Sequence, residues 1–350
     1  MTSKERMLVA MTNGIPDRVP ICPDLSNMIP CKLTGKPFWD IYYYNDPPLW
    51  KAYLDTVRRY DFDGWFWYVG LARSKADQRE YRDEIISRTD DEMVVRTYCQ
   101  TPAGEVWQET LYRRNDPPVV TRHWIKDLQR DFKHLQYFFP DPRDADDEKF
   151  QRAKQLVGDD AVVGFWINYP ILMFDYRDGQ ENAYYDYYDN YDLVKEFVYL
   201  WDRWAIRYLE RALDAKPDFI QTGHSGTLTL QSPDIFRDTG LETLKKITRI
   251  CKEAGVPTML HSCGRQKELV KICAEETDLD AINPLEVPPM GDCDLAELKR
   301  LYGHRLALMG NVHTTEVMLR GTPDDVEATV KKCIEDAGEG GGYILSTGDQ

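Results

Sequence analysis

The chain contains the stretch Val256-Pro257-Thr258-Met259-Leu260-His261-Ser262-Cys263-Gly264. A short, largely apolar run of this kind predicts a buried strand. His261 and Cys263 stand at its end, two residues apart. Residues i and i+2 of a strand project to the same face, so both side chains would face one metal ion or one substrate if the strand continues through Cys263. Imidazole and thiolate are typical zinc ligands. The alternative is a buried histidine and a buried cysteine that only pack.

Short apolar runs of the same kind recur along the whole chain. Together with residues 258–261 of the stretch above, they lie at residues 19–22, 64–69, 161–166, 219–221, 281–283, 306–309 and 343–346. Longer amphipathic segments separate them, and from the third run onward the spacing suits strand–helix–strand crossovers. Eight parallel strands with crossover helices predict an α/β fold, a single (β/α)8 TIM barrel that fills residues 1–350 as one domain.

Local signals place several helix ends. Ser232 and Thr322 each precede a proline, which predicts an N-cap followed by proline in the first helical turn. Gly255 is expected to stop a helix. Residues 191–215 carry apolar side chains at helical spacing and predict one long helix.

Two segments depart from this rhythm. Residues 84–122 alternate β-rich stretches with turns and predict an antiparallel insertion after the second barrel strand. Residues 175–192 are dense in Tyr, Asp and Asn, and are expected to form a mobile loop or lid. A barrel normally carries a helix after its eighth strand, whereas the sequence ends at Gln350, just past that strand.

Composition restricts the partners. A formal net charge of −15 argues against binding to nucleic acid, whose phosphates would be repelled. No apolar stretch approaches membrane-spanning length, and the first residues lack a signal-peptide core, so we expect a cytoplasmic protein. The eight cysteines include no Cys-x-x-Cys pair and are expected to be mostly reduced. The oligomeric state is open, with a homodimer as one candidate.

In such barrels the chemistry lies at the C-terminal ends of the strands. A catalytic zinc site needs a third protein ligand beside His261 and Cys263. The candidates are Asp349, Glu286 and His313, with Cys293 as a further one, and each could instead cap a loop or support a ligand. The candidate catalytic residues are His224, Asn311 and His313, of which His224 is a candidate acid or base. The candidate substrate-binding residues are Asn27, Trp67, Trp166, Asn168 and Tyr169, whose aromatic members could be core or a flat pocket for an aromatic ligand.

With these motifs in place, the chain resembles the uroporphyrinogen decarboxylase superfamily over nearly its whole length. The resemblance is carried by Asp17-Arg18-Val19-Pro20, Thr101-Pro102-Ala103-Gly104, His261-Ser262-Cys263-Gly264, Gly310-Asn311-Val312-His313 and Gly342-Tyr343-Ile344-Leu345-Ser346. It implies the single (β/α)8 barrel. True decarboxylases of the family carry an arginine-rich segment after the first strand, but residues 23–30 contain no arginine, which disfavours porphyrinogen decarboxylation.

The resemblance favours instead the cobalamin-dependent methyltransferase branch, with an O-demethylase-like activity. In that branch the His-x-Cys pair binds catalytic zinc with a later cysteine near the last strand, a position that Asp349 takes here. A carboxylate donates less electron density than a thiolate, so the metal should be a stronger Lewis acid, suited to an ether or phenolate oxygen. The expected reaction moves a methyl group from a small donor, preferably an aryl methyl ether, to the cobalamin (corrinoid) of a partner protein. The alternatives are methylcobalamin:thiol methyl transfer, decarboxylation and non-catalytic tetrapyrrole binding.

Overall fold

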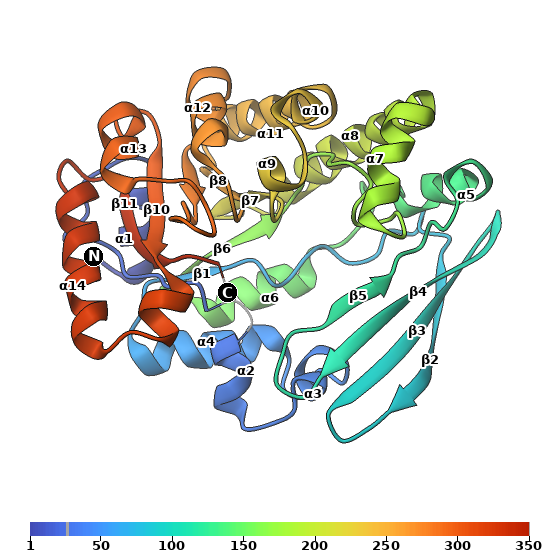
Figure 1. Cartoon of the computed structure of the whole chain (residues 1–350), viewed down its shortest axis with the longest axis horizontal. Helices are drawn as coiled ribbons and strands as arrows, with labels where there is room; N and C mark the ends of the chain where they lie inside the picture. The colour runs from blue at the N-terminus through green and yellow to red at the C-terminus, as the bar shows by residue number, and fades with distance from the viewer. Residues whose placement is uncertain (26–27, 350) are drawn as a thin grey trace.

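The computed structural model describes residues 1–25 and 28–349, so that Asn27 lies outside the described residues. Its centre is a parallel sheet whose strands follow one another in chain order, β1-β6-β7-β8-β9-β10-β11 (Figure 1). The strands are β1 Gly64–Phe66, β6 Ala161–Trp166, β7 Phe219–Gly223, β8 Thr258–His261, β9 Ala281–Asn283, β10 Ala307–Val312 and β11 Tyr343–Thr347. Seven of the eight predicted apolar runs therefore form strands, three of them with the predicted bounds.

The prediction of a first strand at residues 19–22 was wrong, because these residues do not form a strand. Ile21 forms only an isolated parallel bridge with Leu345 of β11. On the other side, the N–H of Asp63, next to β1, donates to the Ile21 carbonyl at 2.9 Å. Pro20 lies within this segment and Pro23 follows it, and both lack the N–H group that a longer ladder needs. The segment thus contacts both ends of the seven-stranded sheet, while the complete eight-stranded barrel stays a prediction.

Helices follow most strands and pack against the sheet (Figure 1). They are α1 Ser3–Met11, α2 Met28–Thr34, α3 Phe38–Tyr42, α4 Leu49–Tyr60, α5 Leu128–Leu135, α6 Glu148–Val157, α7 Gln180–Asp189, α8 Tyr191–Asp214, α9 Thr227–Leu230, α10 Pro233–Thr239, α11 Leu241–Ala254, α12 Lys267–Glu276, α13 Leu295–Tyr302 and α14 Pro323–Ala337, with a 3-10 turn at Gln136–Phe138 and a π-helix at Thr314–Leu319. The predicted caps are confirmed: Ser232 and Thr322 accept N–H groups of the first turns of α10 and α14, and Gly255 ends α11 at φ +69°. The predicted long helix is α8.

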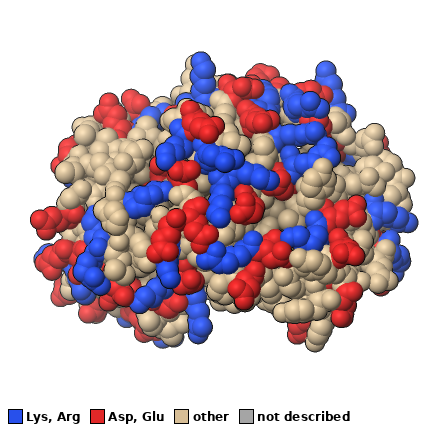
Figure 2. Space-filling model, turned by 90° about the horizontal axis from the view of Figure 1, so that it is seen from above, with Lys and Arg blue, Asp and Glu red and all other residues tan. Residues whose placement is uncertain are grey.

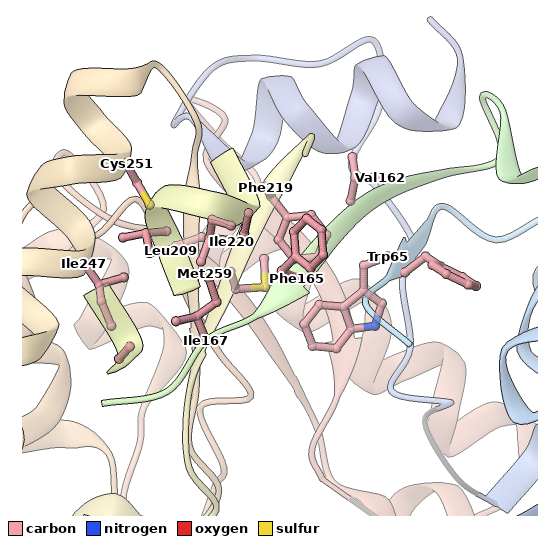
Figure 3. Packing of buried hydrophobic residues seen from close by; sticks show 14 of the residues in the cluster. Trp65, Val162, Phe165, Ile167, Leu209, Phe219, Ile220, Ile247, Cys251 and Met259 are labelled. Atoms are coloured by element: carbon pink, nitrogen blue, oxygen red, sulfur yellow. The ribbon is translucent and has the colours of Figure 1, made fainter. Parts of the chain in front are cut away.

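Along β8, successive residues belong to two different apolar clusters. Met259 of β8 belongs to the larger cluster, which Figure 3 shows with Phe165, Phe219 and Ile220 around it. Its neighbour Leu260 belongs to the other cluster, together with residues of α12 and α13. Since successive strand residues face opposite sides, His261 shares the side of Met259. The fold therefore directs His261 toward the same side of the sheet as the larger cluster.

The predicted insertion is an antiparallel four-stranded sheet beside the parallel one (Figure 1). Its strands are β2 Glu80–Arg88, β3 Glu92–Thr101, β4 Gly104–Arg113 and β5 Val119–Arg122. It begins four residues earlier than the predicted 84–122. Met93 and Val95 of β3 pack against Trp39 of α3, which anchors one face of the insertion to the rest of the protein.

The expectation of a loop over residues 175–192 was wrong, because this segment contains helix α7 and the start of α8. Arg177 and Asp186 form a buried ion pair at 2.6 Å. The Tyr184 hydroxyl donates a hydrogen bond to the Leu230 carbonyl of α9. These contacts fix a segment whose composition alone is typical of a loop.

Within the described residues, no helix combines the length and apolarity that crossing a membrane requires. On the face that Figure 2 shows, basic and acidic side chains are interspersed rather than gathered into one patch of a single sign.

Candidate active site

Three potential metal ligands meet at the C-terminal ends of β8 and β11. His261 is the last residue of β8, Cys263 lies in the loop that follows, and Asp349 stands two residues beyond β11. One ligand atom from each lies within 4.8 Å of the others. The His261 Nε2 atom is 3.8 Å from Asp349 Oδ2. The strand ends before Cys263, yet its side chain reaches the same site as His261, as the spacing predicted.

The donor set fits zinc. Imidazole nitrogen, thiolate sulfur and carboxylate oxygen are all zinc ligands, and their separations require only small side-chain movements to surround one ion at bond lengths of about 2.0–2.3 Å. Burial, with the negative charge of Asp349 beside it, raises the pKa of the Cys263 thiol to about 12, although a hydrogen bond from Ser225 opposes this. Binding of a metal must therefore displace a proton from Cys263.

Glu286, also predicted as a candidate ligand, lies beside this cluster and is almost fully buried. Its Oε2 atom accepts the N–H of Gly264 at 2.5 Å. The backbone N–H of Asp349 also hydrogen-bonds to the carboxylate. Burial raises the pKa of Glu286. In this structure Glu286 holds the two backbone segments that carry Cys263 and Asp349.

A pocket of about 620 Å³ opens directly over the cluster. Its lining residues are Asp24, Met28, Trp65, Trp67, Arg113, Asp116, Pro117, Trp166, Ser225, His261, Thr314, Thr315, Leu319 and Asp349. Two of the predicted substrate-binding residues, Trp67 and Trp166, are among them. This volume suits a small organic ligand.

The indoles of the pocket pack at steep angles to one another. The Trp67 and Trp166 rings are 4.4 Å apart between centroids with an interplanar angle of 74°. Trp166 is 6.1 Å from the His261 ring. Its Nε1–H donates to the Asn168 side-chain oxygen, so Asn168 supports the wall rather than forming it. The aromatic surface therefore lies immediately next to the candidate metal site.

Tyr169 and His224, both predicted site residues, interact with each other away from the pocket wall. Tyr169 is fully buried, and its hydroxyl hydrogen-bonds to Thr227. Its carbonyl accepts the His224 Nε2–H at 2.7 Å. The other ring nitrogen of His224 is 3.7 Å from Asp175 Oδ2. Burial lowers the pKa of His224, which favours the neutral imidazole at pH 7.

The remaining two predicted catalytic residues, Asn311 and His313, form hydrogen bonds to the backbone of neighbouring segments. The Asn311 amide donates to the Leu285 carbonyl at 3.0 Å. The Nδ1 atom of His313 accepts the N–H groups of Thr315 and Glu316 and so caps the π-helix. That π-helix contributes Thr314, Thr315 and Leu319 to the pocket. In this structure Asn311 and His313 thus position segments next to the pocket.

Several pocket residues escaped the sequence-based prediction. Arg113, Asp116 and Pro117 come from the end of β4 and the loop before β5, in the insertion. Nothing local in the sequence marks them, because only the packing of the insertion brings this loop to the strand ends. Asp24 and Ser225, in contrast, follow apolar runs of the sequence, which is where chemistry is expected in such a fold.

Comparison with known proteins identifies the family. The sequence profile of the uroporphyrinogen decarboxylase (URO-D) family matches residues 168–350, just over half of the chain and the part that carries β7 to β11. The chain belongs to the URO-D family. The resemblance inferred from the sequence motifs is therefore confirmed.

Named relatives of this URO-D chain are methyltransferases. A methylcobamide:CoM methyltransferase MtbA of Methanosarcina mazei is 24% identical over 262 residues, covering 71% of this chain and 68% of the relative. A methylcobamide:CoM methyltransferase MtaA of Methanosarcina barkeri is 27% identical over 158 residues, covering 45% and 43%. A solved methyltransferase from Methanosarcina mazei superposes with a TM-score of 0.62 at 19% identity, over 99% of this chain and 93% of that one. This last likeness establishes the shared fold.

Proposed function

We propose that this URO-D protein is a corrinoid-dependent methyltransferase that moves a methyl group from a small donor to the cobalt of a corrinoid protein. The observation that carries the proposal is the meeting of His261, Cys263 and Asp349 at the base of a pocket walled by Trp67 and Trp166. The methylcobamide methyltransferases among the relatives support the corrinoid as methyl carrier. We further propose that residues 19–22 complete an eight-stranded barrel around this site.

The residues of the chain take distinct parts in this proposal. His261, Cys263 and Asp349 would hold zinc, which when bound supplies a Lewis acid for the oxygen of the donor. Trp67 and Trp166 orient the donor and exclude water. Glu286 fixes the backbone on which two of the ligands stand. His224 is too enclosed here to reach the donor, so the oxygen that leaves takes its proton from solvent at the pocket mouth.

An aryl methyl ether is the donor that we propose. Its flat ring matches the indole surfaces, and the small methoxy group could reach the ligand cluster beside Trp166. In the reaction a methyl–cobalt bond forms with the electron pair of cobalt(I), and the methyl–oxygen bond breaks with its electron pair on oxygen. The corrinoid would approach the open mouth of the pocket, where the insertion supplies Arg113 and Asp116.

Methyl transfer from methylcobalamin to a thiol is the second candidate. It is favoured by the names of the two relatives, both methylcobamide:CoM methyltransferases. Decarboxylation of a polycarboxylate has less support, because Arg113 is the only arginine or lysine among the residues that line the described pocket. A tetrapyrrole-binding protein without catalysis would bind its ligand and show no turnover.

The test is methyl transfer by the purified full chain, with a methoxylated phenol as donor and a reduced corrinoid protein as acceptor. We expect methyl–cobalt formation that depends on both and that falls at least about 100-fold in Cys263→Ala, with Cys273→Ala, a buried cysteine of α12, as the matched control. Equal rates with free corrinoid and with the corrinoid protein would contradict the proposed partner. Methylation of an added thiol from methylcobalamin, without ether cleavage, would support the second candidate instead.

A further inference from the structure

The charges around the pocket are predominantly negative. Asp24, Asp116 and Asp349 line it, against one arginine, Arg113. The Arg113 guanidinium is 3.4 Å from the carboxylate of Glu92, which offsets its charge. If Asp349 and Cys263 balance a divalent metal, and Glu92 offsets Arg113, Asp116 still adds a negative charge to the pocket lining. Such a pocket attracts a cation and repels a carboxylate.

The indoles add a second and independent preference for a cation. Trp65 and Trp67 meet at 79°, and Trp67 and Trp166 at 74°. The Trp67 and Trp166 centroids are 4.4 Å apart, so these two rings are in edge-to-face contact and together form one wall of the pocket. The faces of indole rings attract ammonium groups more strongly than those of other aromatic side chains.

From these two observations we infer that the pocket binds a methylated ammonium compound, with the cation against the indole wall and near the carboxylates that line the pocket. The inference names a donor class other than the aryl methyl ether for the proposed methyl transfer, and it rests on that function only for the transfer step. Trp166 lies 6.1 Å from His261, so an N-methyl group held there is beside the candidate reaction centre. The binding step stands on the pocket alone.

The transfer step is chemically balanced for this donor. The methyl group bonds to cobalt(I) of the corrinoid protein through the electron pair of cobalt. The carbon–nitrogen bond breaks with its electron pair on nitrogen, and a neutral tertiary amine leaves. No proton is required, in contrast to the cleavage of an ether. A donor that already carries the positive charge thus needs no acid in the pocket, which agrees with the enclosed position of His224.

The experiment compares choline with its neutral carbon isostere, 3,3-dimethylbutan-1-ol, by calorimetric titration of the full chain loaded with zinc. Both compounds have the same shape, so a difference in affinity reports the charge. We expect choline to bind at least about tenfold more tightly. 4-Methoxybenzoate in a third titration should bind more weakly than choline, because its carboxylate meets the negative pocket.

Two variants locate the site. Asp116→Asn should weaken choline binding several-fold, while Asp90→Asn removes an equal charge at the exposed β2–β3 turn and should not. Trp166→Phe keeps a ring but weakens the cation–π contact, and should reduce the preference for choline over its isostere. Equal affinity for the two isosteres, or no binding of either, would overturn the inference. Because no corrinoid is present, failure of methyl transfer would leave the binding result intact.

Discussion

The carboxylate of Glu286 accepts the backbone N–H of Gly264 at 2.5 Å, and thereby connects the loop after β9 to the loop after β8. The same carboxylate interacts with the backbone N–H of Asp349. A single buried acid thus holds the backbone next to Cys263 and the backbone of Asp349. Loss of a group that orients metal ligands in this way typically lowers metal affinity about 10–100-fold.

Replacement of Glu286 should therefore weaken metal binding although it is outside the ligand cluster. We expect Glu286→Ala to lower zinc affinity about 10–100-fold and Glu286→Gln to lower it less, because the amide oxygen can still accept one N–H. The measurement is a zinc titration against a competing chelator. Glu335→Gln, on the exposed side of α14, is the control. Unchanged affinity in Glu286→Ala would show that the ligands keep their positions without it.

The cluster itself predicts the metal content of the purified protein. We expect about one zinc per chain, lost in His261→Ala and Cys263→Ala because each removes one of the proposed ligands. In Asp349→Ala we expect retention with lower affinity, since the nitrogen and sulfur donors remain. Elemental analysis checks all of these. Absence of metal from the wild-type protein, even after zinc is supplied, would leave binding or metal-free catalysis as the functions to pursue.

Much of the fold was predictable from the sequence because buried parallel strands are short, nearly continuous apolar runs. β6, β8 and β9 have the predicted bounds, and the insertion was recognised from its turns. The strand predicted at residues 19–22 was wrong because an apolar run becomes a strand only where its backbone can form a ladder of hydrogen bonds. Prolines limit that hydrogen bonding. The loop predicted at residues 175–192 was wrong because helix α7 is held by contacts such as the hydrogen bond from Tyr184 to Leu230, which no local pattern reveals.

The candidate site was predictable where it depends on strand ends. His261, Cys263 and Asp349 meet because the carboxyl ends of parallel strands share one edge of the sheet. The walls of the pocket were harder to predict, since Asp116 comes from an insertion whose position no local pattern reveals. Residue type also left roles open: Glu286 has the side chain of a ligand but binds backbone N–H groups.

Gly223 of β7 has no side chain, which allows the neighbouring strand β8 to pack closely against it. It pairs with His261 of β8, and a Cβ atom at this position would lie 2.0 Å from the His261 carbonyl oxygen. The backbone also has φ +110°, a conformation that side chains rarely adopt. We expect Gly223→Ala to destabilise the protein by about 3 kcal/mol or more and to lower zinc affinity, because the change displaces the strand that carries His261.

Gly255, at the end of α11, is the matched control for Gly223. It has φ +69°, and a Cβ atom at this position would meet no heavy atom within 4 Å. Gly255→Ala should therefore cost only about 1 kcal/mol, for the backbone conformation alone, and leave zinc binding unchanged. Denaturant unfolding gives the two free energies. Similar losses in both variants would mean that the close approach of β8 to Gly223 adds nothing to the cost of the backbone conformation.

Acid should weaken the link between β1 and the insertion. Burial opposes ionisation of Asp77, but hydrogen bonds from Arg79 and Arg73 outweigh it and lower the pKa of Asp77 to about 2. The unfolded value is near 3.9, so this contribution to stability is complete above about pH 4 and is lost as the pH falls to about 2. Asp77→Asn should reduce the free energy of unfolding by about 1–2 kcal/mol at pH 7 and by progressively less between about pH 4 and 2. Urea unfolding of both proteins across this range is the measurement, and a difference that does not depend on pH would assign the loss to packing rather than to charge.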